Sequence, residues 1–280
     1  MPGRIEDLLD RIPTKRFEPS LPRDAVEEFR ASGFFTLDRI TTDEEIAWLQ
    51  QIYDALFTGE GGVYVLRDVN TRIDQQRGDH ISQIIRPENY FPALKNTVFW
   101  HNSRRLALQL LGLEANAEID GWGHMVRKAP RDTEEVPWHQ DEAFWDPNFD
   151  YRALGVWMPL DPATVESGCM SMIPGSHKGP VRVHHHVDDD PAVTVIVCND
   201  VDVAQAVPRP VPIGGASFHN CRTLHWSGPN RSARVRRAYV NEWQAVPEKR
   251  AIPHDRGWWW RRQEAMNKYA KERLKPAVTA

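Results

Sequence analysis

The feature that most restricts the fold of this 280-residue chain is a series of short apolar runs between about residues 118 and 245. The runs are rich in Val, Ile, Trp and Tyr and are separated by Pro, Gly, Asn and Asp. Such a series is typical of antiparallel strands in a sandwich or a barrel. The predicted strands are residues 119–127, 153–160, 170–173, 193–197, 215–219 and 235–243.

The first part of the chain, to about residue 115, has a helical pattern instead. Thr42 and Glu45 match a helix-capping box, and apolar residues then recur at helical spacing as far as Gly59. Further helices are predicted at 22–33 and 103–111, with a short strand at 34–37 between the first two helices. We expect these helices to cover one face of the sheets in a single α+β domain, with a β-rich core at about 116–245 and a tail at 248–280.

Composition limits the partners of the chain. Its 35 Lys and Arg against 39 Asp and Glu give a net charge of −4, which argues against a dedicated nucleic-acid binder. No apolar stretch approaches the roughly 20 residues that span a bilayer, and residues 1–10 lack the apolar core of a signal peptide. We therefore expect a cytoplasmic protein with no membrane partner, whose oligomeric state the sequence leaves open.

The numbers of cysteines and histidines indicate a metal site with histidine ligands and argue against a zinc ribbon, which needs paired cysteines. The three cysteines lack C-x-x-C spacing and are expected to be free thiols, whereas the chain has 11 histidines. Histidine is the commonest metal ligand in proteins.

The segment P-W-H-Q-D contains the first candidate ligands, His139 and Asp141. In extended backbone, residues i and i+2 project to the same face, so an imidazole and a carboxylate at this spacing can bind one ion. An H-x-D pair by itself is more often an ordinary surface pair. Here the aromatic residues Trp138, Phe144 and Trp145 flank it, and such side chains can exclude water from a site.

His225, in H-W-S-G-P-N-R-S, is the predicted third ligand. Two histidines and one carboxylate on one face of an octahedron form the non-haem Fe(II) oxygenase site. The three remaining positions can take a bidentate 2-oxoacid and dioxygen, so that oxidation of a substrate is coupled to decarboxylation of 2-oxoglutarate.

A 2-oxoglutarate site also needs a cation for the distal carboxylate. If Pro229 and Asn230 form the turn of a hairpin, Arg236 on the return strand lies on the same face as His225, about 6 to 7 Å farther along at ~3.3 Å per residue. Arg236 is therefore the predicted clamp, and Ser227 could add a hydroxyl. An error of register would move the clamp to Arg234, and a solvated charged strand is the alternative to any clamp.

With these residues the chain resembles the phytanoyl-CoA dioxygenase family of Fe(II)- and 2-oxoglutarate-dependent oxygenases. The matching motifs, in order, are R-A-S-G-F-F-T-L, D-E-E-I-A, W-H-Q-D, V-W-M-P-L-D-P-A-T-V-E-S-G-C-M-S-M-I-P-G-S-H-K-G and H-W-S-G-P-N-R-S-A-R-V-R-R-A. The resemblance implies a double-stranded β-helix, or jelly roll, with buttressing helices. It implies iron at His139, Asp141 and His225, and the distal carboxylate of 2-oxoglutarate at Arg236. Because halogenating relatives lack the carboxylate, Asp141 favours hydroxylation or another oxidation of a small organic substrate, with release of succinate and CO₂.

The chain departs from this pattern before the distal ligand. The segment H-N-C-R-T-L-H makes His219 a competitor of His225, although the S-G-P-N-R-S continuation and the downstream arginine match from His225. The family often covers its site, so residues 63–77 are an expected lid or entrance loop.

The remaining candidate residues also have alternative interpretations. His124 alternates with Trp122 and Val126 on a strand, where it could touch cosubstrate or substrate, or belong to the core. The His184, His185 and His186 run is interpreted as a loop rather than a metal cluster. The predicted substrate residues are Trp138, Phe144, Trp145, Trp157 and Arg222; the aromatic ones could equally be core, and Arg222 could equally form a surface salt bridge.

The tail 248–280 carries nine Lys and Arg against four Asp and Glu, and contains Trp258, Trp259 and Trp260. We interpret it as a closing helix that packs its tryptophans on the domain. Two other functions remain open from sequence. One is a jelly-roll metalloprotein with the same triad that does not use 2-oxoglutarate. The other is a non-catalytic module that binds nucleic acid or anionic lipid through this tail.

Overall fold

The computed structural model describes residues 7–8, 11–58, 83–191 and 195–273. The expected lid at 63–77 lies outside the described residues. The described part combines antiparallel sheets with helices, as the sequence predicts.

The larger sheet has six strands in the order β1-β11-β6-β13-β3-β2. All of its neighbouring strands are antiparallel. The strands are β1 (Phe34–Leu37), β2 (Gln83–Ile85), β3 (Ile119–Lys128), β6 (Ala153–Pro159), β11 (Ala216–Asn220) and β13 (Arg236–Ala245).

The smaller sheet has the order β10-β7-β12-β4 and faces the larger one. Its strands are β4 (Val136–His139), β7 (Met170–Met172), β10 (Val207–Arg209) and β12 (His225–Ser227). A buried cluster that includes Trp157 and Val240 of the larger sheet and Met172 of the smaller one fills the space between them. Two minor pairs complete the strands: β5 (Phe149–Asp150) with β14 (Glu248–Lys249), and β8 (His185–His186) with β9 (Ile196–Val197).

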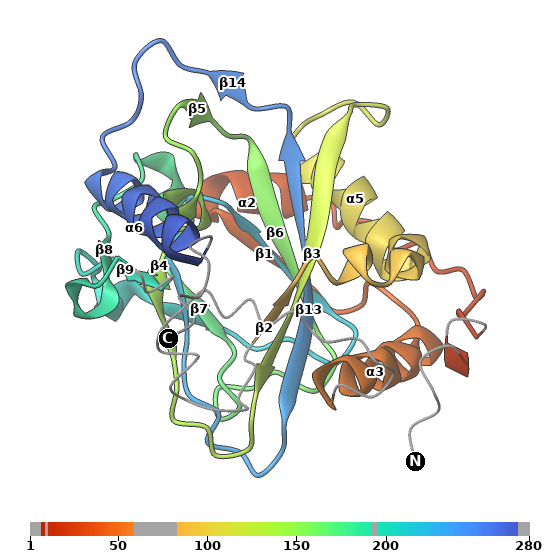
Figure 1. Ribbon diagram of the computed structural model, residues 1–280. Helices are drawn as coiled ribbons and strands as arrows, with labels where there is room; N and C mark the ends of the chain where they lie inside the picture. The colour runs from red at the N-terminus through yellow and green to blue at the C-terminus, as the bar shows by residue number, and fades with distance from the viewer. Residues whose placement is uncertain (1–6, 9–10, 59–82, 192–194, 274–280) are drawn as a thin grey trace, which may run out of the picture.

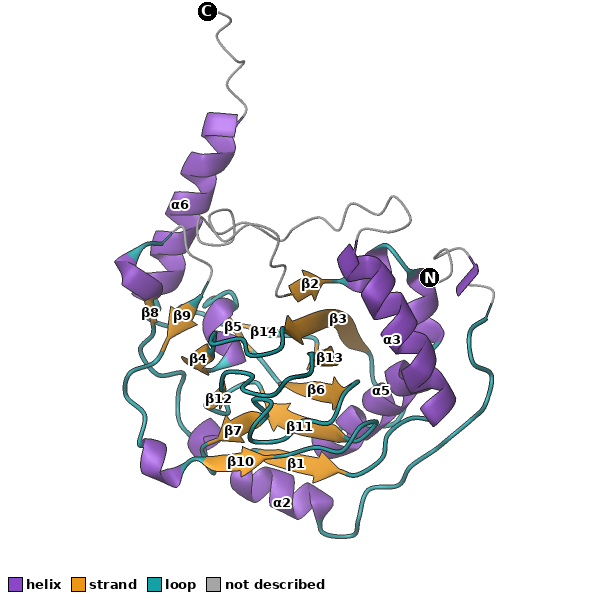
Figure 2. Ribbon diagram, turned by 90° about the horizontal axis from the view of Figure 1, so that it is seen from below, coloured by secondary structure: helices purple, strands orange, loops and turns teal. Residues whose placement is uncertain are grey.

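Two helices cover the opposite face of the larger sheet. Figures 1 and 2 both show α3 (Asp43–Thr58) and α5 (Val98–Leu110) on the side away from the smaller sheet, where they enclose the main apolar core. Helix α2 (Ala25–Ser32) packs beside β1 and α5. Short 3-10 helices occur at η1 (Pro87–Asn89), η2 (Pro92–Asn96), η3 (Asp141–Phe144), η4 (Ser176–Lys178), η5 (Val187–Asp189) and η6 (Val203–Gln205).

Glu45 connects two of these helices. The Thr42 hydroxyl accepts from the Glu45 amide at 3.1 Å, which is one half of the predicted capping box. The Glu45 carboxylate does not complete that box; it accepts from the Val98 and Phe99 amides at 2.6 and 2.8 Å. It thereby supplies hydrogen-bond acceptors to the first turn of α5, which begins at Val98, five residues before the predicted start.

The predicted hairpin between His225 and Arg236 is wrong. Strand β12 pairs with β4 and β7, whereas β13 lies in the other sheet and pairs Arg236 with Lys128. Asn230 explains the crossing, because its side-chain amide donates to the carbonyls of Lys128, Ala129 and Arg234 and so fixes the connection between the two sheets. The strands that carry His225 and Arg236 therefore belong to facing sheets.

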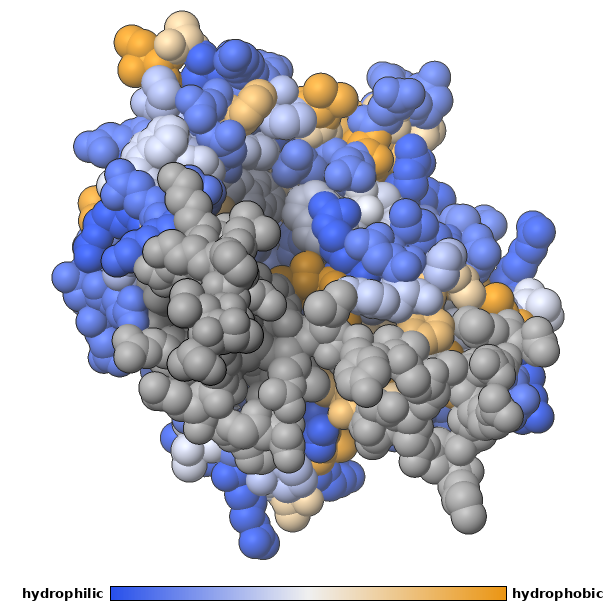
Figure 3. Space-filling view, in the orientation of Figure 1, coloured by the Kyte–Doolittle hydropathy of each residue, from blue (hydrophilic) through white to orange (hydrophobic). Residues whose placement is uncertain are grey.

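Helix α6 (Gly257–Arg273) is the predicted closing helix, and Figure 2 shows it extending away from the sheets. Trp258 is buried against the domain, Trp259 is half-buried and Trp260 is 43% exposed. In Figure 3 the surface around this helix is mostly hydrophilic. Within the described ranges, no helix combines the length and apolar character needed to cross a membrane.

Candidate metal centre

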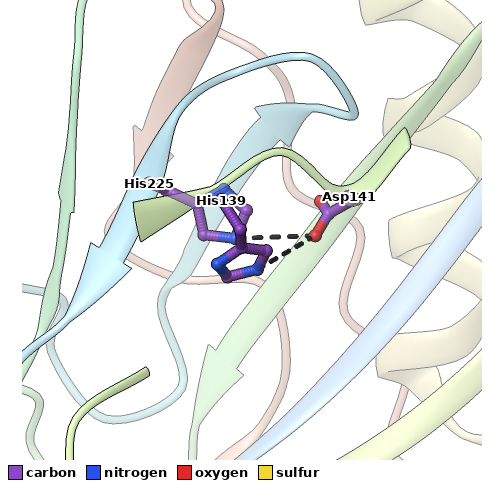
Figure 4. Close-up of side chains that lie close together, drawn as sticks. All are labelled: His139, Asp141 and His225. Carbon is purple, nitrogen blue, oxygen red and sulfur yellow. Dashed lines mark ion pairs between the residues drawn. The ribbon is translucent and has the colours of Figure 1, made fainter. Parts of the chain in front are cut away.

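Three side chains converge between the two sheets. The Nε2 atoms of His139, at the end of β4, and of His225, at the start of β12, lie 3.5 and 3.6 Å from the same oxygen, Oδ1 of Asp141. Figure 4 shows the carboxylate directed at both rings. The strands place the imidazoles together because His139 and His225 are direct partners across the β4–β12 ladder. Gln140 has extended backbone, so Asp141 projects to the face of His139, as the H-x-D spacing predicts.

Both imidazoles are held in the tautomer that a metal needs. Nδ1 of His139 lies 2.7 Å from the Pro137 carbonyl, and Nδ1 of His225 lies 2.9 Å from the Thr223 carbonyl. A carbonyl can only accept, so each Nδ1 carries the proton and each Nε2 presents a lone pair. Two such nitrogens and one carboxylate oxygen are a donor set suited to Fe(II).

His219 contacts the same carboxylate on its other oxygen. Its Nε2 lies 3.1 Å from Asp141 Oδ2. This nitrogen donates to the carboxylate, whereas Nε2 of His225 is free of such a bond. The two candidates for the third ligand therefore differ in geometry, and the difference favours His225 as ligand and His219 as a support for Asp141.

Burial and mutual charge keep these groups in the ionisation states that bind a cation. Burial alone would raise the pKa of Asp141, but the surrounding imidazoles of His225, His139 and His219 hold that pKa well below its ordinary value. Burial and the neighbouring His139 lower the pKa of His225 to about 3. The site thus contains an anionic carboxylate beside neutral imidazole.

Arg236 lies on the inward face of β13. Its side chain is 2% exposed, and its Cζ lies 5.2 Å from the ring centre of Trp157. Its Nε has no hydrogen-bond partner among the described residues, and burial lowers its pKa to about 10. Arg234 is exposed, so of the two arginines only Arg236 faces the interior with donors to spare.

Lys128 is a second buried cation beside Arg236, and the sequence analysis missed it. It is the direct partner of Arg236 on β3, and its Nζ donates to the Ser227 and Gly228 carbonyls. Burial, followed by the charge of Arg236, lowers its pKa to about 7. The predicted cosubstrate residue Ser227 lies at the same place, with its hydroxyl 3.0 Å from the Gly168 carbonyl.

Glu242 is a further missed residue, at the other end of the inward row of β13. Its side chain is 5% exposed, and its Oε2 has no hydrogen-bond partner in the described part of the chain. One oxygen of Glu242, one of Asp141 and one ring nitrogen of His219 lie within 4.8 Å of one another. Burial and the charge of Asp141 raise the pKa of Glu242 well above its ordinary value. Alternation along β13 from Arg236 predicts this inward position, which is the sequence signal that could have identified it.

Gly155 of β6 leaves space for the side chains of His219 and Glu242. A Cβ on Gly155 would lie 2.6 Å from Cε1 of His219 and 3.0 Å from Oε1 of Glu242. The bond from His219 to Asp141 therefore requires glycine at this position.

The four predicted aromatic substrate residues have four different neighbours. The Phe144 ring stands edge-on to His139 at 5.7 Å, and Trp145 packs against Trp122 at 6.1 Å. Trp138 stacks on Trp226, whereas Trp157 lies against Arg236. Phe144 is thus in contact with a candidate ligand, and Trp157 lies at the arginine end of the interior.

Arg222 and His124 also have defined surroundings. The Arg222 guanidinium binds both carboxylate oxygens of the fully buried Glu142, at 2.6 and 3.2 Å. His124 faces inward on β3 opposite Val240; burial lowers its pKa to about 4, although the charge of Asp141 opposes this shift.

The histidine run at 184–186 does not form a separate metal cluster within the described ranges. His185 and His186 form strand β8, which differs from the predicted loop. The buried His184 accepts from the Gln140 amide at 3.2 Å, between the two candidate ligands of the H-x-D motif.

Comparison with known proteins gives an independent view of the chain. The family model described as phytanoyl-CoA dioxygenase matches residues 29–238. The chain is 29% identical over 222 residues to a probable alpha-ketoglutarate-dependent hypophosphite dioxygenase of Stutzerimonas stutzeri, covering 76% of this chain and 74% of that protein. It is 31% identical over 153 residues to phytanoyl-CoA dioxygenase domain-containing protein 1 of Bos taurus, covering 53% of this chain and 52% of that protein.

The fold has a solved counterpart in EvdO2 from Micromonospora carbonacea var. aurantiaca. The structure of EvdO2 complexed with 2-oxoglutarate is 38% identical to this chain, with a TM-score of 0.76, and covers 87% of this chain and 99% of EvdO2. The predicted jelly-roll architecture with packed helices is confirmed.

Proposed function

The chain belongs to the phytanoyl-CoA dioxygenase family and is an Fe(II)- and 2-oxoglutarate-dependent dioxygenase, and we propose that His139, Asp141 and His225 are its iron ligands. The observation that carries this assignment is the approach of two tautomer-fixed Nε2 atoms to one carboxylate oxygen. The bound iron and 2-oxoglutarate together activate dioxygen, so that 2-oxoglutarate becomes succinate and CO₂ while the substrate is oxidised.

We propose that Arg236 binds the distal carboxylate of 2-oxoglutarate. Its inward direction, its burial and its Nε, which has no hydrogen-bond partner among the described residues, support this role, because a dicarboxylate would supply the missing acceptor. Trp157 holds the guanidinium from one side. We assign Ser227 and His124 to the walls of the same cosubstrate site.

The substrate is proposed to be a small organic molecule that approaches from the end of the interior opposite Arg236. Phe144 and Trp145 lie three and four residues after Asp141, and their aromatic faces would exclude water from the reacting C–H bond. Trp138, Trp157 and Arg222 remain predicted contributors, Arg222 through its bond to Glu142. Hydroxylation is the expected outcome. No acid or base from the chain is required for it.

We further propose one catalytic domain, formed by the helical part at about 1–115 and the jelly-roll core at about 116–245 and closed by the tail. The three cysteines are free and buried, which fits a reducing cytoplasm. No nucleic-acid or membrane partner is proposed.

Succinate release from 2-oxoglutarate in the absence of substrate tests the proposed iron ligands. Purified protein with Fe(II) and 2-oxoglutarate in air should release succinate slowly, and Asp141→Ala should abolish the release. Arg234→Ala, at an exposed position, is the matched control and should keep it. Equal succinate release by Asp141→Ala would contradict the proposed ligand set.

A further inference from the structure

We propose that Arg256 and Trp258, at the start of the C-terminal helix, are positioning residues for the iron ligands. They hold residues 139–145, here called the ligand loop, in the conformation that presents His139 and Asp141 to the metal. The inference rests on the proposed function, because the ligand loop is named for that role.

Arg256 binds the ligand loop at both ends of its turn. The side chain is 1% exposed. Its Nη1 donates to the backbone carbonyls of Glu142 and Trp145, and its Nη2 donates to Glu142 Oε1 at 2.7 Å. A single guanidinium thus fixes the backbone on both sides of the turn that follows Asp141.

The Glu142 side chain joins this contact to the sheet that carries His225. Its fully buried carboxylate lies between Arg256 and Arg222, and Arg222 belongs to the segment leading into β12. Because Glu142 is the next residue after Asp141, any shift of its backbone also moves the carboxylate of Asp141. The loss of either arginine would leave a buried charge less well paired.

Trp258 holds the middle of the ligand loop. Its indole Nε1 donates to the Ala143 carbonyl at 3.0 Å. Its own carbonyl accepts from Nε2 of His186 at 2.9 Å, and its ring lies 5.5 Å from that of His184, which accepts from the Gln140 amide. The histidine run and the tryptophan tail therefore act on the same loop, although they are distant in sequence.

These contacts come from outside the part of the chain that matches the family. The match ends at residue 238, and Arg256 and Trp258 lie 18 and 20 residues beyond it. Residues that orient metal ligands typically affect metal affinity 10- to 100-fold, roughly. The C-terminal segment is thus a structural part of the metal site and not only a cover for the domain.

The experiment compares the variants Trp258→Phe and Arg256→Lys with wild type. Trp258→Phe removes the bond to Ala143 but keeps an aromatic ring, and Arg256→Lys keeps the charge but loses the paired donors. Arg261→Gln is the matched control, because Arg261 lies on the same helix as Trp258 and forms an exposed ion pair with Asp189. Each protein is measured for thermal unfolding without metal, for amide hydrogen exchange of residues 139–145 without metal, and for its affinity for Co(II).

In both variants we expect faster exchange in the ligand loop and Co(II) binding weaker by about 10-fold or more. The control should match wild type in all three measurements. Wild-type exchange and wild-type Co(II) affinity in Trp258→Phe and Arg256→Lys would overturn the inference. If Arg256→Lys does not fold, Trp258→Phe decides the question alone. Failure of wild type to bind Co(II) would instead contradict the proposed metal site, and loop exchange would then decide the positioning inference.

Discussion

His219 and Asp141 form a hydrogen bond of 3.1 Å at Oδ2 of the carboxylate, whereas His139 and His225 face its Oδ1. One oxygen of Asp141 is therefore held by a neighbour while the other is directed at the two candidate ligands. This arrangement gives the two histidines of the H-N-C-R-T-L-H segment different roles, although the sequence alone leaves them in competition.

Replacing each histidine separately tests this division. His225→Ala should abolish high-affinity Co(II) binding, because it removes a ligand. His219→Ala should keep binding but weaken it by about 10- to 100-fold, because it removes only the support of Asp141. Titration of Co(II) followed by visible absorption measures both. The reverse order of severity would make His219 the ligand.

Gly155→Ala should mimic the loss of His219. The new Cβ would lie 2.6 Å from Cε1 of His219, so the ring must shift from its position beside Asp141. We expect overpacking to lower the free energy of unfolding by about 1 to 3 kcal/mol, with weaker Co(II) binding. Gly179→Ala is the control, since its Cβ would meet nothing within 4 Å. A Gly155→Ala protein with wild-type metal affinity would contradict the required spacing.

Arg236→Ala should weaken 2-oxoglutarate binding while leaving Co(II) binding intact. Losing hydrogen bonds to a charged group costs about 1.5 to 3 kcal/mol, which is roughly 10- to 150-fold in affinity. Arg234→Ala, two residues away and exposed, should bind 2-oxoglutarate as wild type does. Calorimetric titration of each Co(II)-loaded variant with 2-oxoglutarate measures the dissociation constant. An effect confined to Arg234→Ala would place the clamp there.

Acid should destabilise the metal-free protein partly through His184. Burial lowers the pKa of His184 from 6.5 to about 4. Between these values the unfolded chain takes up a proton that the folded chain does not, so stability is present above about pH 6.5 and lost as the pH falls toward 4.

His184→Gln removes this titration and keeps an acceptor for the Gln140 amide. The free energy of unfolding should then fall less steeply between pH 6 and pH 4, by up to about 1.4 kcal/mol per pH unit. Urea unfolding at several pH values measures the slope. An unchanged slope would show that His184 does not carry the effect.

Local patterns predicted much of the fold. The strand at Phe34–Leu37 has its predicted bounds, and the strands near 119, 153 and 236 start within one residue of prediction, because alternation and turn residues are local signals. Strand pairing depends on contacts between residues far apart in sequence, so local patterns do not predict it. The predicted hairpin at Asn230 is wrong for this reason. Arg236 was nevertheless placed on the inward face, because strand alternation holds whichever sheet the strand joins.

The hydrogen bonds that hold the ligand loop in place could not be predicted from the sequence. The bonds of Arg256 and Trp258 to the ligand loop join residues more than 110 positions apart, and no local period records such contacts. The sequence leaves Arg222 as a substrate residue or a surface residue. Its partner Glu142 is 80 residues away in the chain, and the two meet only when the ligand loop folds beside the segment leading into β12. Glu242, in contrast, follows from the alternation along β13.

The central claim is that His139, Asp141 and His225 bind iron that in turn binds 2-oxoglutarate. Anaerobic titration of the protein with Fe(II) and then 2-oxoglutarate tests it most directly. We predict a weak visible charge-transfer band in wild type, and no band in His225→Ala. Absence of the band in wild type, with iron shown to be bound, would contradict the claim.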